Sequence, residues 1–434
     1  MNIRQISVST PEVLWHGGGN ENGKPDPVYS VDFHPQEEIM CTSGIDANVW
    51  RVSSHNSDQE FLIDLCDHQS AINVAKFSPD GKMLASASER QIVVCFCSYS
   101  TVPDPSSWLT VADIAPLERI WLRPSLNEVF DMQWSPDSTH LIVGAIDCKA
   151  EIIRISTRDS VILPGHSSYI QGVAWDPLGE HVVTQSADRS CKVHKVYTTL
   201  YSSIRGFINA HSSTVKLAGK GHVVMRMQLG YSVPDAEKKV LTAADFGVQD
   251  GAAPTEATPT AGQTNVNLFA DSFVPSFFRR ISWSPDGALI IAPTGIHRPI
   301  EAKTGTAGLP GSSYCTHIFS RANLSSPCVS LAGLEEPSVA VRCCPRPYRL
   351  VSHAGQDTPA AMIPGEYRLV FAVVTLGSVF VYDTQHSHPI AKFSGLHYAP
   401  INDAAWSADG RMLAVCSSDG YLSFFRFEEG ALGY

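Results

Sequence analysis

A unit of short strands recurs along the chain, and its clearest copy runs from His166 to Val196. In that copy apolar and polar residues alternate along YIQGVAW, a turn follows at Asp176–Gly179, and two further apolar runs, HVVTQS and CKVHKV, complete the unit. Alternation with period two and tight turns between the runs predict three strands of an antiparallel sheet. A sheet of this size cannot bury both faces alone, so sheets of the same design must stack against it.

The chain contains seven copies of this unit, each with an anchor residue at the end of its first strand. The copies begin near residues 28, 68, 127, 166, 277, 338 and 400. Their anchors are Phe33, Phe77, Trp134, Trp175, Trp283, Cys343 and Trp406. The separation of 41 residues between Trp134 and Trp175 falls in the spacing of WD40 blades. The pattern predicts an all-β, seven-bladed WD40 β-propeller that occupies residues 1–434 as a single domain.

The N-terminal segment supplies a strand that the last unit lacks. The seventh unit, Pro400–Phe427, has no outermost strand, whereas Ile3–Leu14 alternates weakly and has no local partner. We therefore expect Ile3–Leu14 to pair with Leu422–Phe427, which closes the ring and removes its exposed edges.

Several segments interrupt the repeats. Residues 197–276 include APTEATPTAG and few alternating runs, which is typical of a long, partly disordered surface insertion. Residues 295–313 and 346–366 predict shorter surface loops. The stretch Glu118–Pro124 runs directly into the third unit, so it predicts a connecting strand that enters the third blade.

Polar side chains recur where WD40 repeats satisfy buried turn amides. In such repeats a histidine before the first strand, a serine or threonine in the second and an aspartate in the tight turn hydrogen-bond towards a tryptophan that ends the third. His194 stands at the tryptophan position of the fourth unit, and Phe96, Ile153 and Phe425 replace it elsewhere. The residues predicted to form this structural network are His68, His166, Ser186, Asp188, Asp46, Asp147 and Asp419. They lie in separate turns, so they do not supply the single cleft that a Ser-His-Asp triad needs.

Composition restricts the class of function. With 44% hydrophobic and 17% charged residues, and apolar runs only of strand length, the chain is neither disordered nor membrane-embedded. Its net charge of −11, with no lysine or arginine run longer than a pair, argues against direct, sequence-specific nucleic acid binding. Eleven scattered cysteines and a start unlike a signal peptide predict an intracellular chain with reduced thiols. The sequence contains no phosphate loop, metal-ligand spacing or nucleophile elbow, so we predict no cofactor, no metal and no enzymatic activity.

Two groups of residues are candidate partner contacts. The run Phe277–Arg280 can supply two ring anchors beside a small basic site, or it can be the packed start of a blade with exposed arginines. Arg342 and Arg346 add positive charge close together in sequence. The candidate partner-binding residues are therefore Phe277, Phe278, Arg279, Arg280, Arg342 and Arg346.

Several stretches go beyond the general WD40 pattern. They are PVYSVDFHP, SSYIQGVAWDPLGEHVVTQSADRS, SFFRRISWSPDG, IFSRANLSSP, SVAVRCCP, YRLVFAVV, VFVYDTQ and SSDGY. Together they resemble the WD40 middle subunit, known as the B subunit, of chromatin assembly factor 1 over nearly the whole propeller. SFFRR and the fourth unit are shared with the HIR-type histone chaperone propeller, whereas VRCCP, and YRLVFAVV followed by VYDTQ, favour the assembly-factor subunit.

This resemblance implies a nuclear, non-enzymatic scaffold. Such a subunit joins a large subunit and a second WD40 subunit, and it helps to deposit H3-H4 histones, directly or through the complex, on DNA during replication-coupled and repair-coupled nucleosome assembly. The alternatives are a HIR-type, replication-independent chaperone propeller, a propeller enzyme, or a WD40 substrate adaptor of a ubiquitin ligase. An enzyme needs polar or metal-binding residues that converge on the central channel, whereas a channel of small and apolar residues excludes one.

Overall fold

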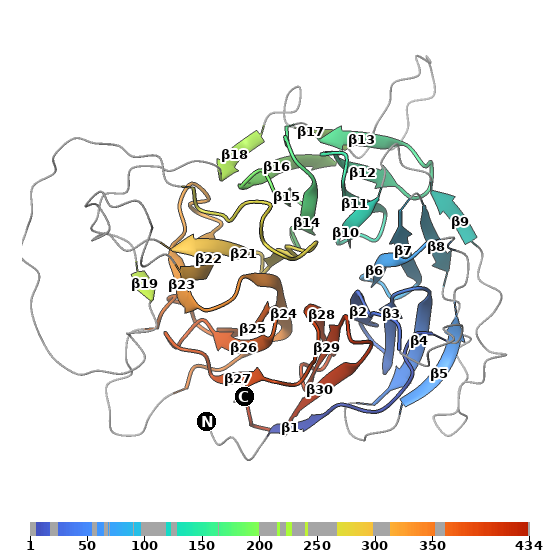
Figure 1. Cartoon of the computed structure of the whole chain (residues 1–434). Coiled ribbons are helices and arrows are strands. Elements are labelled where there is room, and N and C mark those ends of the chain that lie inside the picture. Colours follow the sequence, from blue (N-terminus) through green and yellow to red (C-terminus); the bar gives the residue numbers. More distant parts are fainter. Residues whose placement is uncertain are drawn as a thin grey trace, which may run out of the picture.

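Seven sheets, antiparallel except for one strand of the fifth, form a ring (Figure 1). The computed structural model describes residues 6–17, 25–53, 59–64, 68, 70–89, 91–96, 119–122, 128–163, 165–198, 215–217, 223–227, 239–241, 267–297, 313–351 and 361–432. Contacts between the first strands of neighbouring blades place those strands innermost. The prediction of an all-β, seven-bladed propeller is confirmed.

The first three blades contain four strands each, in order from the innermost to the outermost. Blade 1 contains β2 (Ser30–Phe33), β3 (Ile39–Ser43), β4 (Ala47–Val52) and β5 (Gln59–Asp64). Blade 2 contains β6 (Ile72–Phe77), β7 (Met83–Ser88), β8 (Ile92–Phe96) and β9 (Arg119–Leu122). Blade 3 contains β10 (Val129–Trp134), β11 (His140–Ala145), β12 (Ala150–Arg154) and β13 (Ser160–Leu163).

The predicted insertion supplies two strands to blade 4 and one to blade 5. Blade 4 contains β14 (Ile170–Trp175), β15 (His181–Ser186) and β16 (Ser190–Thr198), and β16 pairs with both β17 (Val215–Leu217) and β18 (Val223–Met227). Blade 5 contains β20 (Ser282–Trp283), β21 (Leu289–His297), β22 (Ser313–Ser320), β23 (Val329–Leu334) and β19 (Lys239–Leu241), which runs parallel to β23. The segment Ala253–Gly262, on which the expectation of disorder rested, lies outside the described residues.

The last two blades complete the ring. Blade 6 contains β24 (Ser338–Tyr348), β25 (Arg368–Thr375), β26 (Ser378–Asp383) and β27 (Ala391–Ser394). Blade 7 contains β28 (Ile401–Trp406), β29 (Met412–Ser417), β30 (Leu422–Phe427) and β1 (Ile6–Ser9). Both β21 and β24 run into ranges predicted as loops, ending at His297 and Tyr348. The central parts of those ranges lie outside the described residues.

The N-terminal strand closes the ring as predicted. β1 pairs antiparallel with β30, from Ile6 opposite Phe427 to Ser9 opposite Phe424. Further along the N-terminal segment, Trp15 is fully buried and packs edge-on against Trp50 of blade 1, with ring centroids 4.7 Å apart. The segment therefore stabilises the junction between the last blade and the first.

The stretch Arg119–Leu122 corrects one expectation from the sequence. It forms β9, whose residues pair with β8, for example Trp121 with Val93. It is thus the outermost strand of blade 2, and the expectation that it enters the third blade is wrong. Its direct sequence connection to the third unit did not reveal its pairing, because a long segment separates β9 from β8 in the sequence.

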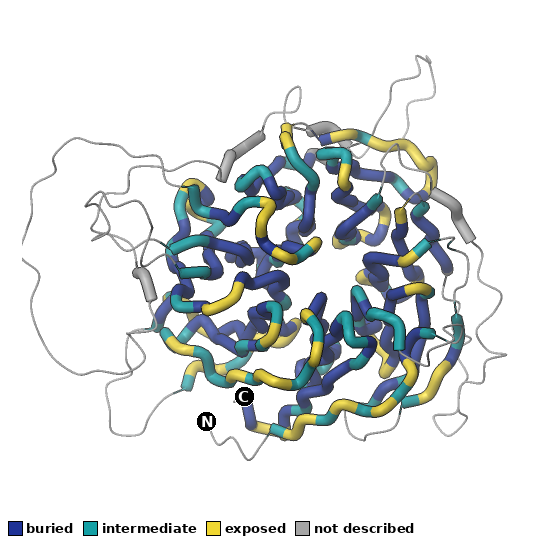
Figure 2. Tube along the Cα trace, in the orientation of Figure 1, coloured by how far each residue is buried: buried dark blue, intermediate teal, exposed yellow. Residues whose placement is uncertain are grey.

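Anchor residues fill the hydrophobic cores between blades. Among the described residues, each of seven buried clusters joins two neighbouring blades. Trp134 of blade 3 packs beside Val94 of blade 2, and its Nε1 donates to the carbonyl oxygen of Lys76 at 2.9 Å. Trp406 makes the same link to the carbonyl of Arg342 at 3.0 Å. Figure 2 shows the buried strands of the ring, with exposed residues at many of its turns.

Among the residues that the structure describes, no helix has the length and apolar character needed to cross a membrane.

Candidate functional site

Charged side chains of the innermost strands gather at the centre of the ring. Each anchor packs between blades, and the residues one and three positions before it project from the opposite face of the strand, because side chains alternate. Asp32, for example, directly precedes the anchor Phe33. These positions hold three carboxylates and three cations: Asp32, Asp131, Asp403, Lys76, Arg280 and Arg342.

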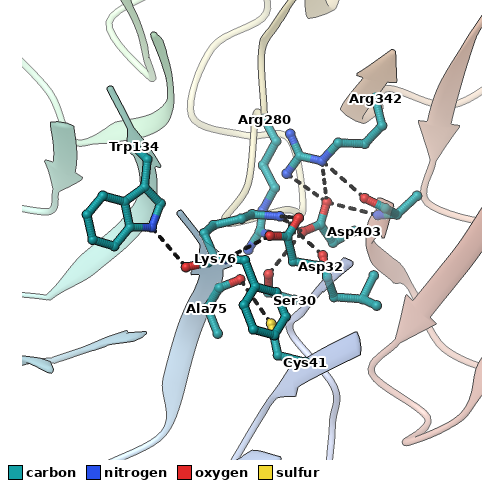
Figure 3. Close-up of polar contacts among 12 residues, drawn as sticks. Ser30, Asp32, Cys41, Ala75, Lys76, Trp134, Arg280, Arg342 and Asp403 are labelled. Atoms are coloured by element: carbon teal, nitrogen blue, oxygen red, sulfur yellow. Dashed lines mark hydrogen bonds and ion pairs between the residues drawn. The ribbon is translucent and has the colours of Figure 1, made fainter. Parts of the chain in front are cut away.

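Asp403 on β28 is the carboxylate that the cations share (Figure 3). Arg280 Nη1 contacts its Oδ2, Arg342 Nη2 lies 2.8 Å from its Oδ1, and Lys76 Nζ lies 3.7 Å from its Oδ2. Ser30 Oγ donates to the same carboxylate at 3.1 Å. Burial raises the pKa of the Asp403 carboxyl, but the three cations outweigh burial and hold the pKa well below its usual range.

Arg280 reaches across the centre of the ring. It lies at the start of blade 5, yet its guanidinium contacts Asp403 of blade 7, and its Nη2 donates to the carbonyl oxygen of Asn73 in blade 2 at 2.8 Å. The side chains of Arg280 and Asp403 are both fully buried. This buried ion pair couples three blades, because separating them leaves an uncompensated charge in the interior.

Asp32 and Asp131 complete the charge balance. Asp32 accepts hydrogen bonds from the backbone nitrogen of Phe77 at 2.9 Å and from Lys76 Nζ at 3.3 Å. Asp131 accepts one from the backbone nitrogen of Val173 at 2.9 Å. Burial raises the pKa of both carboxyls, and the nearby cations only partly oppose it. The centre of the ring thus contains three cations and three carboxyl groups, and these groups interact electrostatically with one another.

Residues 268–281, which we call the strap and which include Arg280, run beside the centre of the ring (Figure 1). The backbone nitrogen of Arg279 donates to the carbonyl of Gln171 in blade 4, and that of Arg280 donates to the carbonyl of Val339 in blade 6, both at 2.9 Å. Gly172 permits this approach, since a Cβ atom there would lie 1.8 Å from the carbonyl oxygen of Arg279. The strap is therefore hydrogen-bonded to the blades on both of its sides.

Adjacent phenylalanines of the strap have different environments. Phe278 is buried, with the Arg280 guanidinium 4.2 Å from its ring centroid and the ring of Tyr29 in blade 1 at 6.4 Å. Phe277 is 69% exposed and stacks on Phe130 of blade 3, with centroids 6.1 Å apart and an interplanar angle of 21°. Through these two rings the strap contacts blades on the far side of the centre.

Comparison with known proteins places the chain in a family. The CAF1B/HIR1 beta-propeller domain matches residues 6–220 and 236–432. The FAS2 homolog of Oryza sativa subsp. japonica, a subunit of chromatin assembly factor 1, is 32% identical over 433 residues, covering 98% of this chain and 73% of that protein. The B subunit of chromatin assembly factor 1 of Mus musculus is 30% identical over 449 residues, covering 99% of this chain and 68% of that protein.

The chain belongs to the CAF1B/HIR1 β-propeller family. The Protein HIR1 of Coccidioides immitis is also similar, at 26% identity over 453 residues, which cover 99% of this chain and 36% of that protein. The resemblance to the WD40 middle subunit of chromatin assembly factor 1, and more distantly to the HIR-type propeller, is thus confirmed.

The candidate partner contacts occupy two places in this CAF1B/HIR1 propeller. Phe277, Phe278 and Arg280 belong to the strap, and Arg342 shares Asp403 with Arg280. Arg346 is exposed and lies elsewhere, in a groove between blades 6 and 7. The structure therefore brings four of these residues together at the centre and leaves Arg346 apart. Contact with a partner stays a prediction for all of them.

Arg279 is a structural cross-link of the strap. Its Nη1 donates to the carbonyl oxygens of Ala270 at 2.7 Å and Ser186 at 3.3 Å, and its Nη2 contacts the carbonyl oxygen of Asp271. Burial lowers the pKa of Arg279 to about 10. Arg279 and Arg280 are both fully buried. The expectation of exposed arginines at the start of this blade is wrong, because backbone carbonyls and Asp403 bind the Nη atoms of both buried guanidinium groups.

The groove that contains Arg346 has a volume of about 750 Å³. Arg349 and Arg411 also line it, together with Asp409 and Glu428. Sequence reasoning missed the blade 7 members of this groove, because the turn of blade 7 meets β24 only in the folded ring.

The predicted polar network is best developed in blade 4. His166 Nδ1 lies 3.0 Å from Asp188 Oδ2, and His166 Nε2 lies 2.7 Å from Thr184 Oγ1. Ser186 instead donates to the carbonyl oxygen of Ser168 at 3.0 Å. Burial raises the pKa of the Asp188 carboxyl, but its hydrogen bonds outweigh burial and hold the pKa well below its usual range.

The other predicted network residues have separate partners. His68 lies 2.8 Å from the hydroxyl oxygens of both Ser86 and Ser88. Asp147 pairs with Lys149 Nζ at 3.0 Å, and Asp419 lies 3.1 Å from His397 Nδ1. Each of these contacts stays within one blade, as expected for structural roles.

In blade 1 the predicted network residue Asp46 has a partner that sequence reasoning missed. Trp50 Nε1 donates to Thr42 Oγ1 at 3.0 Å, and His16 contacts the turn residue Asp46. The histidine comes from the N-terminal segment rather than from the residues directly before β2. The signal available in the sequence was the adjacent Trp15 and His16 of the N-terminal segment, which precede the first repeat unit.

Strand register defines the tryptophan position in every blade. Trp50 lies opposite Met40, and His194 lies in the equivalent place opposite Val182. In blade 2 the equivalent residue is Cys95, which lies opposite Leu84. The assignment of Phe96 to this position is therefore wrong by one residue, and a shift of one residue places a side chain on the other face of the strand.

An acidic cluster on the rim of blades 4 and 5 already contains a cation. Asp176, Glu180 and His181 offer ligand atoms within 4.8 Å of one another. Arg321 Nη2 lies 2.8 Å from Asp176 Oδ2 and 2.7 Å from Glu180 Oε2. The guanidinium pairs with both carboxylates, so the cluster is an ion-pair network.

Proposed function

We propose that this chain is a non-enzymatic scaffold subunit of a histone chaperone complex of the chromatin assembly factor 1 type. In this role it binds a large subunit and a second WD40 subunit, and it helps to deposit H3-H4 histones on DNA in the nucleus during replication-coupled and repair-coupled nucleosome assembly. The observation that carries the proposal is the match of the family to residues 6–220 and 236–432, which include the ring-closing strand and strands of all seven blades.

The assembly-factor role is favoured over the HIR-type role by the extent of similarity. Relatives named for chromatin assembly factor 1 are 32% and 30% identical, and the chain covers 73% and 68% of their lengths. The HIR1 protein of Coccidioides immitis is 26% identical, with 36% of its length covered. Replication-independent deposition is therefore the second candidate.

The central charges support a structural role rather than catalysis. The centre is not lined by small and apolar residues alone, so the simplest ground for excluding an enzyme does not apply. Its three cations are instead paired with Asp32 and Asp403, and Asp403 and Arg280 are fully buried. A catalytic acid, base or nucleophile must reach its substrate, and this buried pair cannot.

Reconstitution tests the assembly role. The chain is co-expressed with the large subunit and the second WD40 subunit of its own organism, purified through a tag on the large subunit, and assayed for nucleosome assembly on replicating DNA. We expect co-elution at equal stoichiometry and reduced histone deposition by complexes that lack the chain. Absence of co-elution, together with undiminished deposition, contradicts the proposal. Association with HIR-type partners instead supports the second candidate.

Localisation is tested separately with a fluorescent fusion. We expect the fusion in the nucleus, with recruitment to sites of DNA replication. Exclusion of a functional fusion from the nucleus contradicts the nuclear assignment.

A further inference from the structure

We propose that the strap forms a docking site for a polypeptide segment in which an aromatic or branched apolar side chain is flanked by lysine or arginine. The site, which we call the aromatic face, consists of Phe273, Phe277, Tyr29 and Tyr169 with the carboxylates Asp26 and Glu128. The inference rests on the chain alone and does not depend on the proposed assembly function.

The first observation is the exposure of two strap phenylalanines. Phe273 is 89% exposed and Phe277 is 69% exposed, although they lie only four residues apart. Figure 2 shows exposed positions of the strap near the middle of the ring rather than at its periphery. Aromatic side chains gain much from burial, and exposed apolar groups clustered in this way mark interaction sites.

The second observation is that the ring of Phe277 is held in place. Phe277 stacks on the buried Phe130, whose ring also lies 6.1 Å from that of Tyr169. Gln171 Nε2 donates to the carbonyl oxygen of Ser276 at 3.0 Å, which fixes the backbone next to Phe277. A surface ordered before binding loses little conformational entropy when a ligand arrives.

The third observation is the charge around the rings. Burial raises the pKa of the Tyr29 hydroxyl, and the negative charges of Asp26 and Glu128 raise it further, so both carboxylates act on this ring. Asn73 Nδ2 donates to Glu128 Oε1 at 3.2 Å and orients that carboxylate. Rings beside carboxylates attract lysine and arginine through cation–π and ionic contacts.

Three arginines at the strap are already engaged with other groups. Within the strap, Arg279 and Arg280 are fully buried, and Arg189 Nη2 lies 2.7 Å from Asp271 Oδ2. The aromatic face therefore presents negative charge beside its rings. Phosphate groups are repelled by such a surface, which favours a basic polypeptide over a nucleic acid as the occupant.

A displayed library of random peptides, selected on the purified full chain at physiological ionic strength, tests the inference. We expect enriched peptides to contain an aromatic or branched apolar residue flanked by lysine or arginine. The affinity of an enriched peptide is then measured by fluorescence anisotropy for the wild-type chain and for Phe277→Ser and Phe273→Ser. We expect each substitution to weaken binding by about tenfold or more, as for an aromatic hot spot.

Three controls distinguish specific binding at this site from nonspecific binding. Leu178→Ser removes another apolar side chain, 58% exposed, from the turn after β14, and it should leave peptide affinity unchanged. Glu128→Gln should weaken binding by about threefold or more and reduce its dependence on salt. A dT oligonucleotide should not compete with the enriched peptide. Circular dichroism and thermal melting establish that every variant is folded.

The inference is overturned by any of several results. These are enrichment of acidic peptides or of none, equal affinity of the folded Phe277→Ser and wild-type chains, an equal loss with Leu178→Ser, and competition by the oligonucleotide. The peptide assay uses the isolated chain, so its result does not depend on whether the chain assembles with the other subunits. Likewise, a negative peptide result does not affect the interpretation of the reconstitution experiment.

Discussion

Replacing Asp403 by asparagine removes the carboxylate that Arg280, Arg342 and Lys76 share at the centre of the ring. Asparagine has almost the same shape and retains an oxygen that can accept from Ser30 Oγ. The substitution therefore changes charge much more than volume. Its cost reports how strongly the buried charges hold the blades together.

The expected destabilisation follows from burial. Removing one partner of a buried ion pair costs about 3–5 kcal/mol, because the remaining charge is left uncompensated. Arg342 Nε keeps its hydrogen bond to the carbonyl oxygen of Ala404 at 3.1 Å, and Lys76 keeps Asp32 at 3.3 Å. We therefore expect a loss near the lower end of that range, about 3 kcal/mol.

Urea unfolding followed by tryptophan fluorescence measures this loss. The control is Glu60→Gln, which removes the charge from an exposed pair with Arg51 and should cost at most about 1 kcal/mol. The double variant Asp403→Asn, Arg280→Met should lose less stability than the two single losses combined, because the pair acts as a unit. If Asp403→Asn costs no more than Glu60→Gln, the central ion pairs do not hold the blades together and the reasoning is refuted.

Three further predictions follow from closure, close packing and ionisation. Deletion of the first fifteen residues removes β1 and Trp15, so thermal stability should collapse, and an unchanged melting temperature contradicts the closure model. Gly172→Ala should destabilise the chain by about 1–3 kcal/mol in urea unfolding, because its Cβ would lie 1.8 Å from the carbonyl oxygen of Arg279. Gly365→Ala, whose Cβ would lie 3.2 Å from the carbonyl oxygen of Tyr367, should cost less, and equal effects of the two substitutions contradict the packing argument. The pKa of Asp188 is lower in the folded state than in the unfolded state, so its stabilisation is present above about pH 4 and is lost as the pH falls. Asp188→Asn should therefore flatten the acid side of the profile of stability against pH, and an unaltered slope excludes this contribution.

Much of the fold could be predicted because its signals are local. Alternating apolar residues form strands, and turn residues connect them. In the Ser-Pro-Asp-Gly turn at Ser78, Ser78 Oγ donates to Asp80 Oδ1 at 2.6 Å and accepts from the backbone nitrogen of Met83 at 2.9 Å. Gly81 has a φ of 74°, which the turn requires. Such interactions span a few residues, so the sequence shows them directly. Likewise, the N-terminal strand has no local partner and the seventh unit lacks its outermost strand, and these two features together predicted that the two pair.

The details of the site were much less predictable. Phe277–Arg280 stood out as a group, but alternation alone did not show that both arginines are buried. Phe96 was assigned in place of Cys95, since no local signal fixes register to one residue at the end of a strand. Arg119–Leu122 was assigned to the wrong blade because the strand that it pairs with lies across a long connecting segment.

The sequence by itself determined that seven similar sheets form a closed ring, because strand periodicity, turn chemistry and repeat spacing are short-range properties. Only the tertiary structure decided which side chains meet at the centre. Asp403 and Arg280 are separated by 123 residues, and Asp403 and Ser30 by 373. The ring geometry brings them together and buries their charges. The same geometry leaves Phe277 exposed beside the buried Phe278, because the strap turns one ring toward Arg280 and the other toward solvent.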